Sequence, residues 1–313
     1  MRRPRHDNGE IRIGISGWTY APWRGNFYPE ELPQKDELNF ASRQFRSIEI
    51  NGTFYGLQRP EVFGRWLDET PDDFVFAVKA PRFITHIKRL REPKAPLANF
   101  LASGVLRLGA KLGPLLWQFP PSFKFDEEKF EHFLSLLAHN MKQAKACAKT
   151  CDDRMEKPGY LDMPKTGKIR HAVEIRHASF CVPAFIALLR KYKVALVVAD
   201  TAGKWPYVED LTSDFVYMRL HGDKKLYASG YSDAAIERWA ERIDAWRRGA
   251  QPADAHLIAK KQKSPSRKSR DIFCYFDNDI KVRAPYDARK LLERFDLART
   301  LQVAPGDLQG VEF

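Results

Sequence analysis

A chain of 313 residues with 44% hydrophobic content can bury the core of one large α/β barrel or of two ordinary domains. The formal net charge is +12, and nine of the positive charges lie in two stretches without acids, residues 2–5 and 260–270, so the rest of the chain is nearly balanced. Four cysteines in a chain of this length exclude a disulfide framework, and no apolar run is long enough to cross a bilayer.

Taken in chain order, apolar runs bounded by turn residues predict eight strands. They cover residues 11–16, 47–51, 74–79, 115–119, 171–176, 194–200, 215–221 and 272–278. Helical patterns lie between most of them, which predicts an α/β fold of one domain, a TIM-type (β/α)8 barrel. An open doubly wound sheet is the structural alternative, and it is disfavoured because no glycine-rich nucleotide-binding turn follows the first run.

Two apolar stripes at helical spacing predict helices outside this barrel. The first follows Asp126, a residue type that caps helix N-termini, and consists of Phe130, Phe133, Leu134 and Leu137. The second consists of Ile236, Trp239, Ala240, Ile243 and Trp246.

Two polar segments interrupt the alternation of strands and helices, and we expect both to be insertions in a barrel domain that covers residues 11–302. The first insertion covers residues 142–168. The second covers residues 249–270, is basic and low in apolar residues, and is expected to be mobile. Residues 1–10 and 303–313 are expected to form a basic N-terminal tail and a C-terminal tail. The charged first ten residues contain no signal-type apolar region, which predicts a cytoplasmic location without a membrane partner.

Polar residues gather where the predicted strands end. In a parallel barrel the carboxyl ends of the strands meet at one face, and the functional site lies there. Strict alternation places Glu174 and Arg176 on one face of their strand, and Arg219 and His221 on one face of theirs. The candidate substrate-binding residues at this face are Trp18, Asn51, Tyr55, Lys79, His86, Gln118, Arg176, His177, Asp200, Arg219 and Asn278.

Glu49, Glu174 and His221 are the candidate catalytic residues. The imidazole of a histidine at a strand end suits general acid and base catalysis, although a structural histidine bonded to a loop carbonyl fits equally well. Arg176 could hold Glu174 ionised as a base, or Glu174 could merely orient the arginine.

The cations at this face have two interpretations. Lys79, Arg176 and Arg219 converge on one mouth, which favours a substrate phosphate or carboxylate. Alternatively, Glu49 and Glu174 neutralise these cations in an internal salt-bridge network that fixes the strand register and performs no chemistry.

No cofactor is evident in the sequence, because the motifs of phosphate loops, dinucleotide sites and zinc proteases are absent. A divalent metal is a weaker alternative, since Glu49, Glu174, Asp200 and His221 offer oxygen and nitrogen ligands. Resident cations at the same mouth oppose the binding of another cation.

Eight short blocks of the sequence together resemble the pattern of a known family. They are IGISGW (13–18), IEINGTFY (48–55), FAVK (76–79), ITH (84–86), QFPP (118–121), VEIRH (173–177), RLHG (219–222) and YFDN (275–278). In this order they are similar to the YecE-like proteins, also called domain of unknown function 72. The resemblance covers nearly the whole chain and implies a TIM-type barrel with a polar pocket at its carboxyl face. It implies no settled activity.

The leading hypothesis is an enzyme, a hydrolase or lyase, that binds a small anionic or phosphate-bearing substrate at the mouth of the barrel. A second hypothesis is a nucleic-acid-associated protein that holds phosphates with residues 2–5 and 260–270. A third is a non-catalytic ligand sensor built on the same pocket, since both an enzyme and a sensor need a preformed polar cavity.

Overall fold

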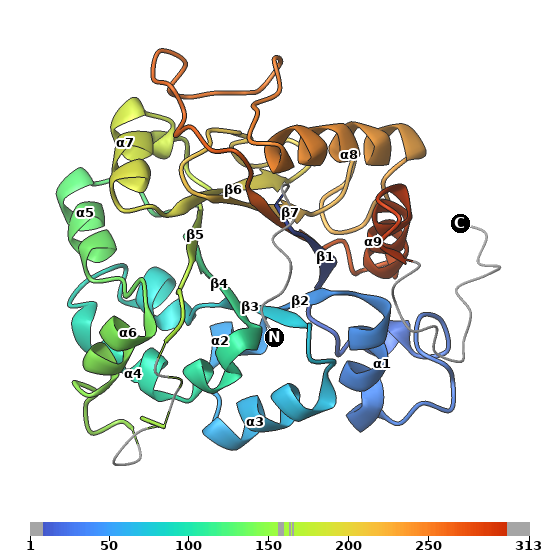
Figure 1. Cartoon of the computed structure of the whole chain (residues 1–313), viewed down its shortest axis with the longest axis horizontal. Coiled ribbons are helices and arrows are strands. Elements are labelled where there is room, and N and C mark those ends of the chain that lie inside the picture. Colours follow the sequence, from blue (N-terminus) through green and yellow to red (C-terminus); the bar gives the residue numbers. More distant parts are fainter. Residues whose placement is uncertain (1–8, 156–159, 163, 165, 299–313) are drawn as a thin grey trace.

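The computed structural model describes residues 9–155, 160–162, 164 and 166–298, and its eight parallel strands form a closed barrel (Figure 1). Neighbouring strands pair in chain order, and β8 pairs with β1. The strands are β1 (Ile11–Ser16), β2 (Ser47–Ile50), β3 (Val75–Lys79), β4 (Leu112–Gln118), β5 (His171–Glu174), β6 (Ala195–Asp200), β7 (Phe215–Leu220) and β8 (Asp271–Phe276). The predicted TIM-type barrel is confirmed.

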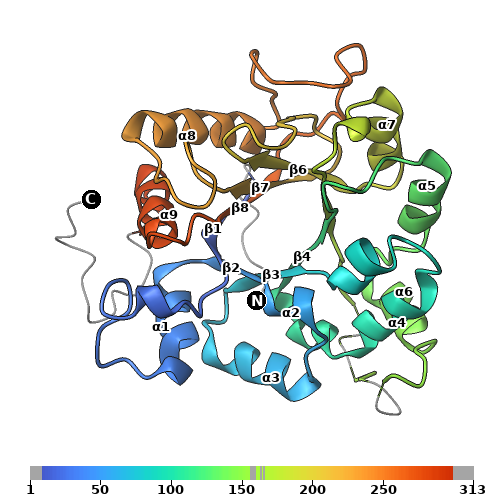
Figure 2. The same ribbon diagram turned by 180° about the vertical axis from the view of Figure 1, so that it is seen from behind.

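Helices surround this barrel, as the two opposite views show (Figures 1 and 2). They are α1 (Glu37–Gln44), α2 (Gly52–Tyr55), α3 (Pro60–Glu69), α4 (Lys94–Ala102), α5 (Glu127–Ser135), α6 (Met141–Ala148), α7 (Pro183–Lys191), α8 (Asp233–Arg247) and α9 (Arg283–Arg294). Shorter helical turns are η1 (Ala21–Trp23), η2 (Gln34–Asp36), η3 (Phe83–Ile87), η4 (Val105–Lys111) and η5 (Ala178–Phe180). Among the described residues no helix has the length and apolar character that a membrane span requires.

The two predicted apolar stripes lie on helices α5 and α8. The carboxylate of Asp126 accepts a hydrogen bond from the backbone N–H of Lys129 and so caps the first turn of α5. Leu137 is buried but lies beyond the end of this helix. Both predicted helices are therefore present.

The fourth strand begins three residues earlier than the sequence predicts, at Leu112 instead of Leu115. Gly113 and Pro114 follow the true start, and both residue types are rare inside strands. The sequence pattern therefore predicts that the strand begins after them. Gly113 is needed here because a Cβ atom at this position would lie 2.8 Å from the carbonyl oxygen of Phe76. The pairing of β3 with β4 shifts register between Phe76 and Val78, at the same place.

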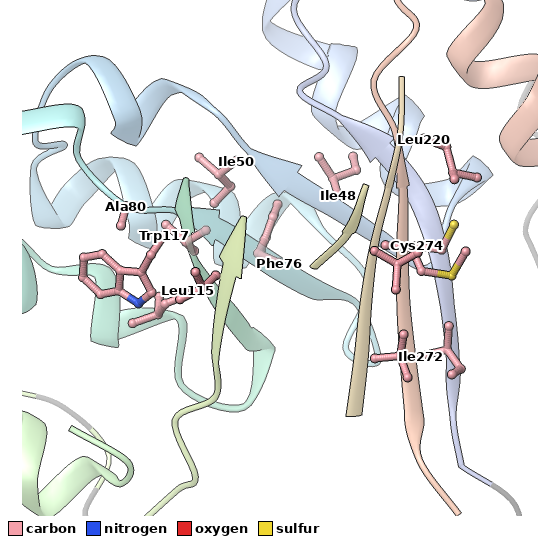
Figure 3. Close-up of a cluster of buried hydrophobic side chains, with 14 of the residues drawn as sticks. Ile48, Ile50, Phe76, Ala80, Leu115, Trp117, Leu220, Ile272 and Cys274 are labelled. Atoms are coloured by element: carbon pink, nitrogen blue, oxygen red, sulfur yellow. The ribbon is translucent and has the colours of Figure 1, made fainter. Parts of the chain in front are cut away.

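Side chains alternate between the two faces of the barrel strands. Figure 3 shows outward-facing residues of the core between strands and helices, such as Ile48, Phe76 and Trp117. The inward-facing residues form a separate apolar cluster that includes Ala77 and Tyr217. This inner cluster fills the middle of the barrel, and the next inward-facing residues along the strands are polar.

The segment 249–270 is held to the body of the protein rather than detached from it. It connects α8 to β8 (Figure 1, orange). Because it leads into the start of β8, it lies at the amino ends of the strands, opposite the carboxyl face. The backbone N–H groups of Ile258 and Ala259 donate to the carboxylate of Asp210 over 2.7 and 3.0 Å. Arg270, which the sequence groups with the cations of this segment, is only 1% exposed.

The segment 142–168 begins with most of helix α6. This helix buries Met141, Ala144 and Ala148 and lies against α4. The predicted C-terminal tail and residues 1–8 of the predicted N-terminal tail lie outside the described residues.

Candidate functional site

A layer of polar side chains lies inside the carboxyl end of the barrel, and Arg219 is at its centre. The other members of this polar layer are Glu49, Lys79, Glu174, Arg176, His221 and Asp277. Arg219 is 0% exposed, and it binds Glu49 through two bonds, Nε to Oε2 at 3.1 Å and Nη2 to Oε1 at 2.9 Å. Its Nη1 donates to Oε2 of Glu174 at 2.7 Å, and its Nη2 donates to Oδ2 of Asp277 at 2.8 Å. Burial opposes the charge of Arg219, but these carboxylates raise its pKa well above the ordinary value.

Glu49, on β2, has no free acceptor position. Its Oε1 accepts from the Ser16 hydroxyl at 2.5 Å and from Arg219, and its Oε2 accepts from the Tyr217 hydroxyl at 2.6 Å and from Arg219. A carboxylate offers about four lone-pair positions, and all of them are occupied. Glu49 therefore orients Arg219 and offers no open oxygen to a ligand in this arrangement.

Glu174, at the end of β5, retains one acceptor position that no residue in the described part of the chain occupies. Its Oε1 accepts from Nε2 of Gln118 and from Nε of Arg176, both at 2.8 Å, and its Oε2 accepts from Arg219. Burial opposes ionisation, yet Arg176 and Arg219 lower the pKa of Glu174 well below the ordinary value. The predicted proximity of Glu174 and Arg176 is present, and the carboxylate is held ionised.

Asp277 is the member of this layer that the sequence reasoning missed. It follows β8, and its Oδ2 lies 2.9 Å from Nδ1 of His221 as well as beside Arg219. Burial opposes ionisation of Asp277, but Arg219 and His221 lower its pKa below the ordinary value. His221 is 0% exposed, and its Nε2 lies 3.4 Å from Nη1 of Arg219.

Two cations occupy the outer side of this layer. Lys79 ends β3, and its Nζ lies 4.3 Å from the centre of the Phe54 ring. No carboxylate of a described residue forms an ion pair with Lys79, and burial, followed by the charge of Arg219, lowers its pKa to about 8. The guanidinium of Arg176 lies over the Trp205 ring at 3.7 Å, which holds the arginine in place.

His86 and Asn51 border the same layer. The ring of His86 meets the Phe54 ring edge to face at 5.0 Å, and its Nδ1 is 2.8 Å from the Thr85 hydroxyl. Burial, then the charges of Lys79 and Arg176, lower the pKa of His86 to about 4, so it is neutral at pH 7. The amide of Asn51 donates to the Ser16 hydroxyl at 3.0 Å.

The structure does not bring Asp200 or Asn278 to this layer. The carboxylate of Asp200 accepts from the Tyr231 hydroxyl at 3.0 Å and from the backbone of Ala202 at 3.3 Å. The amide of Asn278 donates to Asp287 at 2.8 Å. Side chains alternate along a strand, and Asp200 and Asn278 occupy positions that face the outside of the barrel. The predicted contact with the mouth therefore does not form.

Trp18, Tyr55 and His177 also lie away from the polar layer. Gly17 adopts a left-handed φ of 81°, which ends the alternation of β1, and the Trp18 ring packs edge to face on Trp66 at 5.3 Å. Tyr55 is 70% exposed. His177 faces away from Glu174 and accepts a hydrogen bond from the backbone of residue 179 as the cap of η5.

The polar layer is balanced in charge. Three cations, Lys79, Arg176 and Arg219, face three carboxylates, Glu49, Glu174 and Asp277. Within the described ranges no three His, Cys, Asp or Glu side chains converge as metal ligands. The sequence prediction, no evident cofactor with a divalent metal as the weaker alternative, stays a prediction.

The family model described as "Protein of unknown function DUF72" matches residues 12–309. The chain belongs to the DUF72 family. Among curated relatives, this DUF72 protein is 24% identical to the UPF0759 protein YunF of Bacillus subtilis (strain 168), over 92% of this chain and 95% of YunF. It is 33% identical to the UPF0759 protein YecE of Escherichia coli (strain K12), over 38% of this chain and 47% of YecE.

Crystal structures of two other DUF72 proteins have the same fold. The protein from Thermotoga maritima superposes with a TM-score of 0.68 at 24% identity, over 92% of this chain and 99% of that one. A protein from Enterococcus faecalis superposes with a TM-score of 0.63 at 16% identity, over 97% of this chain and 99% of that one. Identities this low show a shared fold.

Proposed function

We propose that this DUF72 protein is an enzyme of the hydrolase or lyase type that binds a small anionic or phosphate-bearing substrate at the carboxyl face of its barrel. The observation that carries the proposal is that Lys79 is partly buried without an ion-pair partner among the described side chains. This lysine stands beside three carboxylates that are already bound to arginine, and none of them forms an ion pair with it among the described side chains. An anionic group of a substrate would supply the direct ion-pair partner that Lys79 lacks among the described side chains.

Arg219 has a different role in this proposal. Its guanidinium is fully buried, and Nε, Nη1 and Nη2 all donate to carboxylates. It is therefore a positioning residue that fixes Glu49, Glu174 and Asp277, and the substrate anion is left to Lys79 and Arg176. Arg176 uses Nε for Glu174 and is 12% exposed, and its fork-shaped guanidinium suits phosphate or carboxylate.

Proton transfer in this site would involve Lys79. A lysine whose pKa is about 8 populates both protonation states near neutral pH, which is the condition for general acid and base catalysis. Glu174 has an acceptor position that no described side chain occupies, and Nδ1 of His221 lies 2.9 Å from Oδ2 of Asp277, so both remain candidates for the base. His86, neutral at pH 7, would contact a substrate without adding charge.

The proposal is tested by sulfate binding, because the charge of sulfate does not change between pH 6 and pH 10. We expect Lys79→Ala and Arg176→Ala each to weaken sulfate binding about tenfold at pH 7 in isothermal titration calorimetry, the effect of one lost charged hydrogen bond. In the wild type, affinity should fall as pH rises through about 8, where Lys79 loses its charge.

Lys124→Ala is the matched control, since Lys124 is exposed and follows β4 at the same face of the barrel. It should leave the affinity unchanged. Equal affinity in the wild type and in folded Lys79→Ala and Arg176→Ala variants would remove the basis of the proposal. If the two variants do lose affinity, turnover of the bound anion separates an enzyme from the alternative, a ligand sensor.

The alternative of nucleic-acid binding concerns the opposite face. In the segment 249–270 the cations Lys260, Lys261, Lys263, Arg267 and Lys268 are exposed, whereas Arg270 is buried. Because this segment precedes β8, its charges lie at the amino ends of the strands, away from Lys79. Binding of a nucleic acid there stays a prediction that is independent of the site at the mouth.

A further inference from the structure

A cavity of about 290 Å³ lies beside the mouth of the barrel. The segment after β2 contributes Phe54, Tyr55 and Leu57 to its lining, and the segment after β3 contributes Arg82 and Ile87. Both segments follow the carboxyl ends of strands, so the cavity opens on the same face as the polar layer.

The lining of this cavity is apolar and unusually exposed. Tyr55 is 70% exposed, Leu57 42% and Ile87 53%. They are three of the four large hydrophobic residues that are exposed in the described part of the chain, the fourth being Ile280. A cluster of exposed apolar side chains around a concave surface is typical of a ligand site, whereas a single exposed residue such as Ile280 needs no explanation.

Phe54 forms a wall shared by the cavity and the polar layer. Its ring lines the cavity. The same ring contacts Nζ of Lys79 at 4.3 Å and the ring of His86 at 5.0 Å. A ligand group at Lys79 and a ligand group in the cavity would therefore be separated by one aromatic ring.

The charge of the cavity favours an anionic ligand. Arg82 lies over the Tyr55 ring at 5.5 Å and makes no ion pair with any residue in the described ranges. Arg154, also in the lining, contacts Asp152 at 3.5 Å, and the side chain of this arginine is 63% exposed. Positive groups at the rim of an apolar cavity attract an anion that carries an apolar group.

The backbone near the cavity is irregular in a way that often accompanies ligand sites. The turn η3, which carries Ile87, has π-helical hydrogen bonding, a rare form that is frequent at functional sites. Arg89 and Leu90, which follow it, adopt left-handed φ values of 50° and 61°. Such conformations are costly for residues with side chains and persist where the surrounding structure fixes them.

From these observations we infer that the cavity beside Phe54 receives the apolar group of the substrate whose anionic group is bound by Lys79 and Arg176. The inference rests on the proposed function and narrows its substrate class to an organic phosphate or carboxylate that carries an aromatic or short aliphatic group. It assigns substrate discrimination to Ile87, Tyr55 and Leu57, and the chemistry to the polar layer.

The test compares two probes, inorganic phosphate and phenyl phosphate, which share the anionic group and differ in one phenyl ring. In the wild type we expect phenyl phosphate to bind about tenfold more tightly in isothermal titration calorimetry, because the ring leaves water. Ile87→Asn should remove this difference, because it places a polar amide in the apolar lining. It should leave the affinity for inorganic phosphate within about twofold, since neither side chain carries a charge.

Ile280→Asn is the matched control, because Ile280 is a similarly exposed isoleucine, 60% exposed, that follows β8 and does not line the cavity. It should preserve the difference between the probes. If the wild type binds inorganic phosphate but gains nothing from the phenyl ring, the inference is wrong and the proposed function stands. If the difference survives both Ile87→Asn and Leu57→Asn, the ring binds elsewhere and the inference is also wrong. If neither probe binds, both statements fail together.

Discussion

Arg219 and Arg270 are both buried arginines, 0% and 1% exposed, and they lie at opposite faces of the barrel. Arg219 donates to carboxylates from three different parts of the chain. Arg270 donates to backbone carbonyl groups, of Ser213 at 3.3 Å, of Gly249 at 2.9 Å and of Pro265. The first arginine organises charged side chains, and the second fastens a loop.

The pKa values of the two arginines express this difference. Burial lowers the pKa of Arg270 to about 10, and neighbouring Arg267 adds to the effect, because no carboxylate compensates fully. Burial acts on Arg219 in the same direction, but its carboxylate partners reverse the shift. Burial of a cation therefore does not identify a functional site. The chemical nature of its partners distinguishes the polar layer at the mouth from the anchor of a loop.

Removing Arg219 is expected to have the largest effect on stability. The variant Arg219→Ala leaves Glu49, Glu174 and Asp277 buried without their shared counter-charge, and breaking such a buried pair costs about 3–5 kcal/mol. Urea unfolding at pH 7, followed by circular dichroism, measures this loss in the free energy of unfolding. The control is Arg248→Ala, which removes a mostly exposed ion pair with Asp244 and should change stability by less than about 1 kcal/mol. Similar losses in the two variants would contradict the central role of Arg219.

Removing Arg270 is expected to have a smaller and local effect. The variant Arg270→Ala leaves buried carbonyl groups without donors, at a cost of about 1–3 kcal/mol. Limited proteolysis should then cut within residues 249–270 faster than in the wild type, while sulfate affinity at the mouth stays the same. Arg267→Ala, the exposed neighbour, should change neither property. A weaker affinity for sulfate in Arg270→Ala would show that the two faces are coupled.

The acid dependence of stability should distinguish the same two variants by a still smaller amount. The pKa values of Glu174 and Asp277 are lowered from ordinary values of 4.5 and 3.8, so their contribution is present above pH 4.5 and is lost as pH falls below it. Each group accounts for at most about 1.4 kcal/mol per pH unit.

Urea unfolding between pH 3 and pH 7 measures this slope. Arg270→Ala should lose stability on acidification as the wild type does, because its carboxylates at the mouth are intact. Arg219→Ala should lose less, since its unpaired carboxylates gain from protonation. Parallel curves for Arg219→Ala and the wild type would show that Arg219 does not set these pKa values.

The succession of eight strands with helices between them predicted the barrel, and the alternation of side chains along the strands predicted several members of the polar layer. Glu49, Glu174 and Arg219 share the inward parity of their strands, and the structure places them in direct contact. The same rule applied to Tyr275, which faces inward, would have selected Asp277 and excluded Asn278. Both faces of β8 are apolar, however, with Ile272 and Cys274 facing outward and Phe273 and Tyr275 facing inward, so the sequence alone does not show which parity points to the mouth.

Other features depend on distances that alternation does not contain. The sequence placed Arg219 among the anion-binding cations, but the structure shows Nε, Nη1 and Nη2 engaged by carboxylates. It grouped Arg270 with the exposed cations, whereas the side chain turns inward to loop carbonyls. The cavity beside Phe54 combines segments after two strands, and no local pattern indicates that these segments meet.

The position of Arg219 also has a consequence for the order in which the barrel forms. Ser16 and Glu49 belong to the first two strands, whereas Tyr217 and Arg219 belong to the seventh. During synthesis from the N-terminus, the first half of the chain emerges with Glu49 and without its counter-charge. A folded half-barrel with a buried, unpaired Glu49 would be unstable. We therefore expect closure of the barrel and the pairing of Glu49 with Arg219 to occur together in folding.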